Sequence, residues 1–439
     1  MKKLTKIISI IILSIVILSI VFISTEAKDV KRSYFKVKSD AGKYLIKDIK
    51  KHEFKNNIVS VETSKKNIEN LKKNKNLEFI GDAIVYKPLQ IYNRPLKIPP
   101  SPGRSSSKST INRVCKLTDY NLPQINYGIK YMYEDPNLVK PSGGRNVKVA
   151  ILDTGVNISH PDIVNRVKYC KDVTTNPESN TCDDSSTIPA GHGTLVASIV
   201  AADSGSDNLG MYGVAPEADI YAIKVCISES CYDDDLAAGI YDAVNNGANI
   251  ISMSIGGIGL NPVVKDALDY AYDNNVLLIA AAGNYFGTYP NVNTINDPAA
   301  YYRVISVGAI NPDYTTWLSS ARGINDGDYF REEREIEFGA PGTVILAASK
   351  DGCYSYGGGT SLAAPHVAGL AAKLWRGDAS TTRLLMQRSA TLHDLDVFGD
   401  DTATGFGLPT IRIPEGEYPP ININPWNELP RQNKPLGGN

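Results

Sequence analysis

The chain reads Gly359-Thr360-Ser361-Leu362-Ala363-Ala364-Pro365-His366 where a glycine-rich approach gives way to the apolar run from Val367 to Leu374. This run predicts a buried helix, and the preceding glycines let the backbone come close to a bound group. Backbone N–H groups in the first turn of a helix have no partner within it, so they face developing negative charge. We therefore interpret Ser361 as a candidate nucleophile at a helix N-terminus.

Two earlier segments offer the groups that a serine nucleophile needs. Lys148 to Asp153 reads as a buried parallel strand that ends in a carboxylate, at the sheet edge where reacting groups of α/β proteins gather. His192 lies between two glycines and opens the apolar stretch Leu195 to Val200, which predicts a position on the first turn of a second helix. A base must take the serine proton, and a carboxylate must orient that base. We assign these roles to His192 and Asp153, although each residue alone is more often a turn or a satisfied polar residue.

An amide donor follows another apolar strand. Val276 to Ile279 leads into Ala280-Ala281-Ala282-Gly283-Asn284. Asn after Gly is ordinarily a turn signal. Beside the other three motifs, however, the Asn284 side chain is expected to bind the oxyanion of an acyl-transfer reaction.

These four blocks resemble the subtilisin-like serine peptidases, in which the acid, the base and the nucleophile follow in this order. The resemblance covers approximately residues 120 to 412. Leu362 replaces the Met usual beside the nucleophile, a change that nearly conserves volume. The charged segment from Arg322 to Glu335 also departs from the family, and we interpret it as a solvated surface loop. Further blocks stand in family order: His160-Pro161-Asp162, Gly213-Val214-Ala215-Pro216, Ile251 to Gly257, Val307-Gly308-Ala309 and Ala340-Pro341-Gly342.

Apolar strands alternate with helical segments, which predicts an α/β fold with a parallel sheet and helices on both faces. The resemblance implies the subtilisin-like version of this sheet, preceded by a small α+β, ferredoxin-like prodomain. It also implies a secreted serine endopeptidase that works through an Asp-His-Ser triad and an acyl-enzyme, and that is made as a self-processing zymogen. The alternative is a catalytically silent binding or surface module of the same fold. Strands are expected near Val147–Leu152, Asp219–Val225, Ile250–Ser254, Val276–Ala281 and Val304–Gly308.

Two other hydrolase classes lack support in the sequence. No His-Glu-x-x-His spacing is present, which argues against a zinc metallopeptidase. The stretch Gly359 to Ala363 lacks the second glycine of an α/β-hydrolase nucleophile elbow, and both other triad members precede the serine.

By the same resemblance, a peptide substrate would bind as an added β-strand beside Ser254, Ile255 and Gly256. The segment Ala281-Ala282-Gly283 would line the opposite wall of the pocket for the residue before the scissile bond. The expected partners are protein or peptide substrates and the chain's own propeptide. A monomer is expected.

A structural Ca2+ is the expected cofactor, because hard oxygen ligands suit this ion. The resemblance assigns to it the carboxylates of Asp162 and Asp207, the backbone carbonyls of Leu209 and Met211, and a side-chain oxygen of Gln124. The alternative for this region is a plain turn rich in Asp, Asn and Gly.

The N-terminus predicts export. Lys2-Lys3 precedes an apolar run from Ile7 to Ile23, and Ser24 to Ala27 follows it, as in a signal peptide. The run is also long enough for a retained membrane anchor, so a membrane tether through residues 7–23 stays open. Either outcome predicts a secreted or cell-surface protein. The formal net charge of −1 gives no general attraction to nucleic acid, and none is predicted as a partner.

The chain is expected to divide into five regions, and two of them have distinctive patterns. The region at residues 28–86 has its own core pattern. Strands are expected at residues 34–37, 58–61, 77–80 and 84–86, and Ser64 is expected to cap a helix that carries Ile68 and Leu71. An unrelated N-terminal binding module is the alternative. The region at residues 87–118 is rich in Pro and Ser, and self-cleavage is expected after Tyr86 or within this region. The regions are a signal peptide or signal anchor (1–27), an inhibitor-like propeptide (28–86), a linker with the maturation site (87–118), a subtilisin-like peptidase domain (119–412) and a Pro/Asn-rich tail (413–439).

Six cysteines form an even set, and disulfides persist in exported proteins. Cys226 and Cys231 bracket a short loop and Cys170 and Cys182 a polar one, which would leave Cys115 for Cys353. Some of these residues could instead be buried thiols, and the sequence alone does not fix the connectivity. If Cys115 is bridged, maturation cleavage must fall before it.

Overall fold

The structure is a computed structural model that describes residues 30–89, 92–95, 115–288 and 293–414. The chain forms two compact units, the first ending at Ile84 and the second beginning at Val85. Each unit has its own buried apolar cluster.

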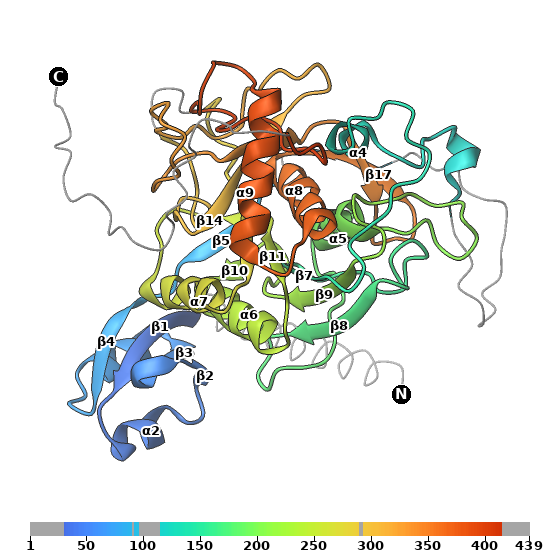
Figure 1. Ribbon diagram of the computed structural model, residues 1–439. Coiled ribbons are helices and arrows are strands. Elements are labelled where there is room, and N and C mark those ends of the chain that lie inside the picture. The colour runs from blue at the N-terminus through green and yellow to red at the C-terminus, as the bar shows by residue number, and fades with distance from the viewer. Residues whose placement is uncertain (1–29, 90–91, 96–114, 289–292, 415–439) are drawn as a thin grey trace, which may run out of the picture. The chain divides into compact units, whose positions relative to one another are not determined.

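The N-terminal unit is a small antiparallel α+β fold, as predicted, with the order βαββαβ, in which the first helix and the second strand were not identified from the sequence (Figure 1). Its strands lie in the order β2-β3-β1-β4. Phe35, Val61 and Ile68 are fully buried between the sheet and its helices. The predicted cap is formed, since Ser64 Oγ accepts from Asn67 N at 3.3 Å. The elements are β1 (Val30–Val37), α2 (Asp40–Ile46), β2 (Lys50–Glu53), the 3-10 helix η1 (Lys55–Asn57), β3 (Ile58–Ser64), α3 (Lys65–Lys72) and β4 (Leu77–Asp82).

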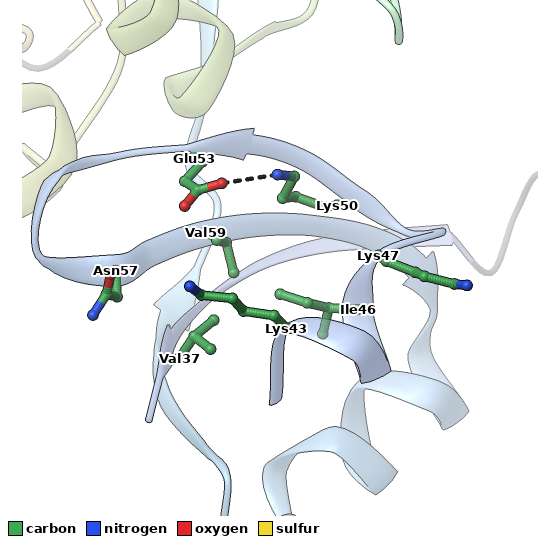
Figure 2. Close-up of a pocket in the computed structure, with 8 residues that line it drawn as sticks. All are labelled: Val37, Lys43, Ile46, Lys47, Lys50, Glu53, Asn57 and Val59. Atoms are coloured by element: carbon green, nitrogen blue, oxygen red, sulfur yellow. Dashed lines mark hydrogen bonds and ion pairs between the residues drawn. The ribbon is translucent and has the colours of Figure 1, made fainter. Parts of the chain in front are cut away.

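Figure 2 shows a cavity of about 210 Å³ in this unit. Apolar side chains of the small core meet charged groups there, and Lys50 Nζ and Glu53 Oε2 form an ion pair of 2.8 Å. None of the predicted site residues lines it. The lining residues are Val37, Lys43, Ile46, Lys47, Lys50, Glu53, Asn57 and Val59.

The second unit is built on a seven-stranded sheet, in which every strand pairs in parallel with its neighbours. The five strands expected from apolar runs are present, and one further strand extends the sheet at each edge. In spatial order the strands are β15 (Phe338–Pro341), β14 (Val304–Ile310), β13 (Leu277–Ala281), β11 (Ile250–Met253), β7 (Lys148–Asp153), β9 (Asp219–Lys224) and β8 (Val167–Asp172). From β7 the chain crosses to the edge strand β8, returns through β9, and then continues on the other side of β7 from β11 to β15. The connections that leave β7 and its neighbour β11 thus run in opposite directions, which puts β7 at the topological switch point where such sheets gather reacting groups.

Helices cover both faces of this sheet (Figure 1). The helices α5 (His192–Ala201) and α8 (Thr360–Leu374) pack against each other on one face. On the other face lie α6 (Asp233–Asn245) and α7 (Pro262–Asp273). All of α5 and nearly all of α8 are buried, which explains why both are apolar around their whole circumference. The remaining helices are α4 (Tyr127–Met132), α9 (Ala379–Ala390) and the 3-10 helices η2 (Leu117–Tyr120) and η3 (Thr391–His393).

Two small antiparallel sheets flank the large one. The first has the order β10-β5-β12 and consists of β10 (Cys231–Tyr232), β5 (Val85–Pro88) and β12 (Ile255–Gly256). The second has the order β16-β17-β6 and consists of β16 (Ile345–Ala348), β17 (Tyr354–Gly358) and β6 (Tyr92–Pro95). The strand expected at residues 84–86 as part of the N-terminal unit is thus β5, which pairs instead with strands of the second unit.

The disulfide pattern favoured by the sequence is confirmed. The bridges are Cys115–Cys353, Cys170–Cys182 and Cys226–Cys231. The first joins positions 238 residues apart, and Cys353 directly precedes β17.

The charged segment from Arg322 to Glu335 was expected to be a solvated surface loop, and this expectation is wrong in part. Much of the segment from Arg322 to Glu335 is exposed, but Arg331 and Glu335 are buried. Arg331 Nη2 donates to Ala299 O at 3.0 Å, and its Nε lies 3.8 Å from the buried Glu337 carboxylate. Burial lowers the pKa of Arg331 to about 10, and the Glu337 charge opposes this effect. The Glu337 carboxylate makes the burial of the Arg331 charge tolerable. Local sequence does not reveal that these two side chains meet.

Within the described part of the chain, no helix is both long and apolar enough to cross a membrane. The apolar run at residues 7–23 lies outside the described residues.

Candidate active site

The end of β7 and the start of α5 bring an acid and a base together. Asp153 is the last residue of β7, and His192 is the first residue of α5. Asp153 Oδ1 lies 2.7 Å from His192 Nδ1 and also accepts from Thr154 N at 2.7 Å. An ionised carboxylate only accepts hydrogen bonds, so Nδ1 carries the proton and Nε2 is free to act as a base.

Two further carboxylates act on this histidine. Burial lowers the pKa of His192, but the charge of Asp153 and its hydrogen bond, followed by the charges of Asp184 and Glu229, raise it above its ordinary value of 6.5 on balance. Asp184 is partly buried and accepts from Thr154 Oγ1 at 2.8 Å and from Thr194 Oγ1 at 2.6 Å. Through Thr154 and Thr194, Asp184 therefore connects the end of the strand that carries Asp153 with the start of the helix that carries His192.

Ser361 is the second residue of α8, after the N-cap Gly359. Gly359 has φ 139°, a value that strongly favours glycine, and its N–H donates to Gly342 O at 2.7 Å. Ser361 Oγ and His192 Nε2 are both buried, and neither has a hydrogen-bond partner among the described residues. The helices that carry them are packed together, and Leu362 shares an apolar cluster with Leu195.

Asn284 follows β13 and is held by the residue before the serine. Thr360 donates to Asn284 Oδ1 through its backbone N at 3.0 Å and its Oγ1 at 2.9 Å. The same Thr360 Oγ1 accepts from Gly283 N at 3.1 Å. Because Oδ1 is fully engaged with two donors, the NH2 group of Asn284 must point the other way.

That NH2 group meets a backbone carbonyl of the chain itself. Asn284 Nδ2 donates to Leu89 O at 2.5 Å, and Ser361 N donates to the same oxygen at 3.3 Å. An acyl-transfer site requires two donors on the carbonyl oxygen and a nucleophile beside it. Here Asn284 Nδ2 and Ser361 N are the donors, and the hydroxyl of Ser361 has no hydrogen-bond partner among the described residues.

The segment before Leu89 lies as an added strand. In β5, Pro88 pairs with Ile255 and Lys87 with Gly256, and Leu89 N donates to Ser254 O at 3.1 Å. These are the three residues predicted to pair with a substrate.

Glycines make room for two side chains of this strand. A Cβ on Gly256 would come within 2.9 Å of Leu89 Cδ1, and a Cβ on Gly257 within 2.6 Å of Tyr86 Cδ1. Leu89 and Tyr86 are both buried, and Tyr86 OH donates to Gly259 O at 2.9 Å. Strand β12 is therefore an edge that leaves room for Leu89 and Tyr86, two side chains three positions apart in an extended peptide.

The wall predicted at Ala281-Ala282-Gly283 is held by its own backbone. Ala282 N donates to Val307 O at 3.0 Å, and Ala282 O accepts from Asn296 N at 2.8 Å. Gly283 has φ 123°, and a Cβ there would lie 2.2 Å from Asn296 Oδ1. All three residues are buried beside Asn284, the candidate oxyanion donor.

Strand pairing resumes beyond Leu89. Residues Tyr92–Pro95 form β6, which runs antiparallel to β17, with Tyr92 opposite Gly358 and Pro95 opposite Ser355. The backbone is therefore paired on both sides of the carbonyl that the two donors hold.

Comparison with known proteins places this geometry in a family. The sequence profile of the Subtilase family matches residues 144–407, more than half of the chain. The chain belongs to the subtilase family of serine peptidases. It is 39% identical over 310 residues to a subtilisin from Bacillus sp. (strain TA39), covering 65% of this chain and 72% of that protein. It is 37% identical to the major intracellular serine protease of Bacillus subtilis (strain 168), covering 58% of this chain and 75% of that one.

Among solved structures, the fold is similar to that of Sphericase, with a TM-score of 0.61 and 40% sequence identity over 66% of this chain and 99% of that one. The protein is thus a subtilisin-family serine endopeptidase, with a small antiparallel α+β region ahead of its catalytic sheet.

The residues predicted for calcium gather in this subtilase, and the oxygens they present can be tested for fit. Gln124 Nε2 donates to Asn208 O and Gly210 O, both at 2.9 Å, so two carbonyl oxygens converge on one point. Asp162 is buried, and a Cβ on Gly210 would lie 1.9 Å from its Oδ1.

The other predicted ligands make contacts within the chain. Asp162 Oδ2 accepts from Met211 N and Tyr354 OH, both at 2.8 Å. Met211 O accepts from Ser204 N at 2.8 Å, and Asp207 Oδ1 accepts from Leu209 N at 3.0 Å. The converging carbonyls belong to Asn208 and Gly210, neighbours of the predicted Leu209 and Met211. The two carbonyls hold the Gln124 amide nitrogen, and turning that amide would present its Oε1 beside them and the Asp162 carboxylate, an oxygen set that would fit Ca2+.

Sequence reasoning did not identify Thr360, Asp184 or Leu89 as site residues. Thr360 lies inside the motif first quoted, so its position beside Ser361 was an available signal. Asp184 precedes His192 across a loop, and only the fold shows that it contacts both Thr154 and Thr194. For Leu89, the available signal was the apolar residue at the start of the linker.

The electrostatics around His192 predict the pH dependence of hydrolysis. As the predicted base, His192 would act in its neutral form, so kcat/KM should fall as pH decreases through the raised pKa, and the acidic limb should lie above pH 6.5. Asp184→Asn removes a negative charge that favours the imidazolium, so the limb should move to lower pH. The measurement is kcat/KM for a chromogenic peptide across pH 5 to 10.

A second carboxylate gives the control for this shift. Asp242 is also partly buried and accepts from Tyr169 OH at 3.0 Å, but it does not contribute to the pKa of His192. Asp242→Asn should leave the limb in place. Equal shifts in both variants, or none in Asp184→Asn, would contradict the assignment.

Proposed function

We propose that this subtilase is made as a secreted zymogen that cuts its own Leu89–Gln90 bond and then hydrolyses extended peptide segments of other proteins. One observation carries the proposal: the carbonyl of Leu89 accepts hydrogen bonds from Asn284 Nδ2 and Ser361 N, while the residues before it pair with β12. A substrate strand and the segment that ends the propeptide thus share one position.

The proposed reaction begins at this carbonyl. Ser361 Oγ attacks the carbonyl carbon of Leu89 and its proton passes to His192 Nε2, with Asp153 holding the imidazolium in orientation. The oxyanion receives hydrogen bonds from Asn284 and from Ser361 N. His192 then gives its proton to the amine of Gln90, which leaves, and water releases the acyl group by the same steps in reverse order.

The contacts of Leu89 support a preference for large apolar residues before the scissile bond. Its side chain is 2% exposed and packs beside Gly256. Burying a leucine side chain contributes about 2 kcal/mol, which is enough to favour it over a charged residue at this position. Tyr86, fully buried three residues earlier, supports a second apolar preference.

Secretion is supported by the three disulfides and by the signal-like residues 1–27. An intracellular protease is among the relatives, so family membership alone does not decide the compartment. Retention of a membrane tether through residues 7–23 is the alternative to release.

A structural calcium ion is proposed at Asp162, Asp207 and the loop carbonyls that converge on Gln124. There it would neutralise the carboxylates and fix the loop 207–211, and it would take no part in the chemistry.

The nucleophile is tested by Ser361→Ala. This change should abolish casein hydrolysis and leave the propeptide attached, because both reactions use the same hydroxyl. Activity on casein and the mass of the purified chain are measured together, with labelling of the wild type by a fluorophosphonate as the positive control. Wild-type-like turnover in the variant would refute the role, and an unlabelled wild type would favour the catalytically silent module.

The scissile bond is tested on the released propeptide. Mass spectrometry of that fragment should give Leu89 as its last residue, whatever later trimming occurs at the new N-terminus. Leu89→Asp should slow release by roughly 100-fold, since it puts a charge in an apolar site. The matched variant Lys87→Asp changes an exposed side chain and should process at the normal rate. A fragment that ends at another residue would exclude this bond.

Chelation tests the calcium proposal. A site saturated about 100-fold above its Kd stabilises the fold by roughly 2.7 kcal/mol, so EDTA should lower Tm by about 5–10 °C. Asp207→Ala should weaken the recovery of Tm on adding Ca2+ back. The proposal fails if differential scanning fluorimetry gives the same Tm for the wild type with and without EDTA.

A further inference from the structure

Strand β5 is paired on both of its edges, and the second partner is held by a disulfide. Cys231 pairs with Tyr86 and Tyr232 with Val85, which makes β10 the strand opposite β12. Counted back from the proposed scissile bond, Tyr86 and Val85 are the fourth and fifth residues. A peptide long enough to reach these positions therefore lies between two strands, whereas a shorter one meets β12 alone.

Strand β10 has only two residues, too few to hold an extended conformation unaided. Its first residue is Cys231, bonded to Cys226, which lies two residues beyond β9 of the large sheet. The two Cα atoms are 4.0 Å apart, and both cysteines are fully buried. The bridge thus connects the central sheet directly to the edge that contacts the peptide.

The loop within this bridge is tightly closed. Ile227 N donates to Ser230 O at 2.9 Å, and Ser230 N donates back to Ile227 O at 3.0 Å. Glu229 at its tip accepts from Thr187 N at 2.7 Å, which ties the tip to a neighbouring loop. Ile227 is 45% exposed, so apolar packing contributes little there, and the covalent bridge carries much of the constraint.

We propose that the Cys226–Cys231 disulfide is a positioning element of the substrate site, which preorganises β10 so that the enzyme selects peptides extending at least four residues before the scissile bond. This inference rests on the proposed function. Ordering a free loop each time a peptide binds would cost conformational entropy, and a covalent closure removes most of that cost in advance. Because β10 contacts the peptide away from the reacting carbonyl, the gain appears in binding and leaves the chemical step unchanged.

The test compares two peptides with one variant. The full-length chain carrying Cys226→Ala/Cys231→Ala is allowed to process itself. It is then assayed with acetyl-Val-Tyr-Lys-Pro-Leu and acetyl-Lys-Pro-Leu p-nitroanilides, the first of which reaches β10. For the longer peptide, KM should rise about tenfold, because one to two backbone hydrogen bonds to β10 are lost. The kcat for this peptide should stay within about twofold of the wild-type value. Both constants for the shorter peptide should change by less than about twofold, since it pairs only with β12.

A second disulfide controls for the loss of a bridge as such. Cys170→Ala/Cys182→Ala removes a bridge that closes on β8, away from β5, and any loss should be equal for the two peptides. If the first variant does not fold, Cys226→Ala/Cys231→Val fills more of the buried space and gives the same comparison.

The outcomes separate this inference from the proposed function. Equal effects of the Cys226–Cys231 change on both peptides, or no effect on either, would overturn the inference while wild-type hydrolysis leaves the peptidase assignment intact. Absence of hydrolysis by the wild type would overturn both.

Discussion

The hydrogen bond between His192 Nδ1 and Asp153 Oδ1 is the contact on which the candidate site depends. Both side chains are fully buried, and a carboxylate buried without such a partner would bear a large desolvation cost. The sheet provides the partner, because Asp153 ends the strand at the switch point and His192 begins a helix packed on that strand. Asp184 adds a second connection between the same two segments through Thr154 and Thr194.

The central strands could be predicted because each is a nearly continuous apolar run, as expected for a sheet buried on both faces. The two edge strands could not. Strand β8 (Val167–Asp172) is half exposed and carries Lys168 and Lys171, and β15 (Phe338–Pro341) contains Gly and Pro. Such segments read locally as turns, and only pairing with a neighbouring strand makes them extended. Arg331 was misassigned for a related reason, since its charged partner Glu337 directly precedes β15, beyond the loop.

The candidate catalytic residues could be selected from local motifs, because each sits at a recognisable strand end or helix start. How they are joined could not be read in this way. The contact between Asn284 and Thr360 spans 76 positions, and that between Leu89 and Asn284 spans 195. The register of β5 depends on two strands from different parts of the chain, β10 and β12, and the carbonyl of Leu89, directly after β5, reaches the donors only in that register. Local sequence predicts neither the pairing nor its offset.

The two donors to Leu89 O differ in length, and both bear on catalysis. Asn284 Nδ2 lies at 2.5 Å and Ser361 N at 3.3 Å. A donor lowers the barrier only as far as it binds the transition state more strongly than the ground state. In the proposed reaction the carbonyl oxygen would gain charge as its carbon becomes tetrahedral, and both donors already face that oxygen. Thr360 meanwhile fixes Asn284 through two bonds to Oδ1, so its amide is oriented before the reaction begins and needs no reorganisation. In the proposed reaction both donors would hold the oxyanion, the Asn284 amide oriented in advance by Thr360 and the Ser361 backbone at the start of α8.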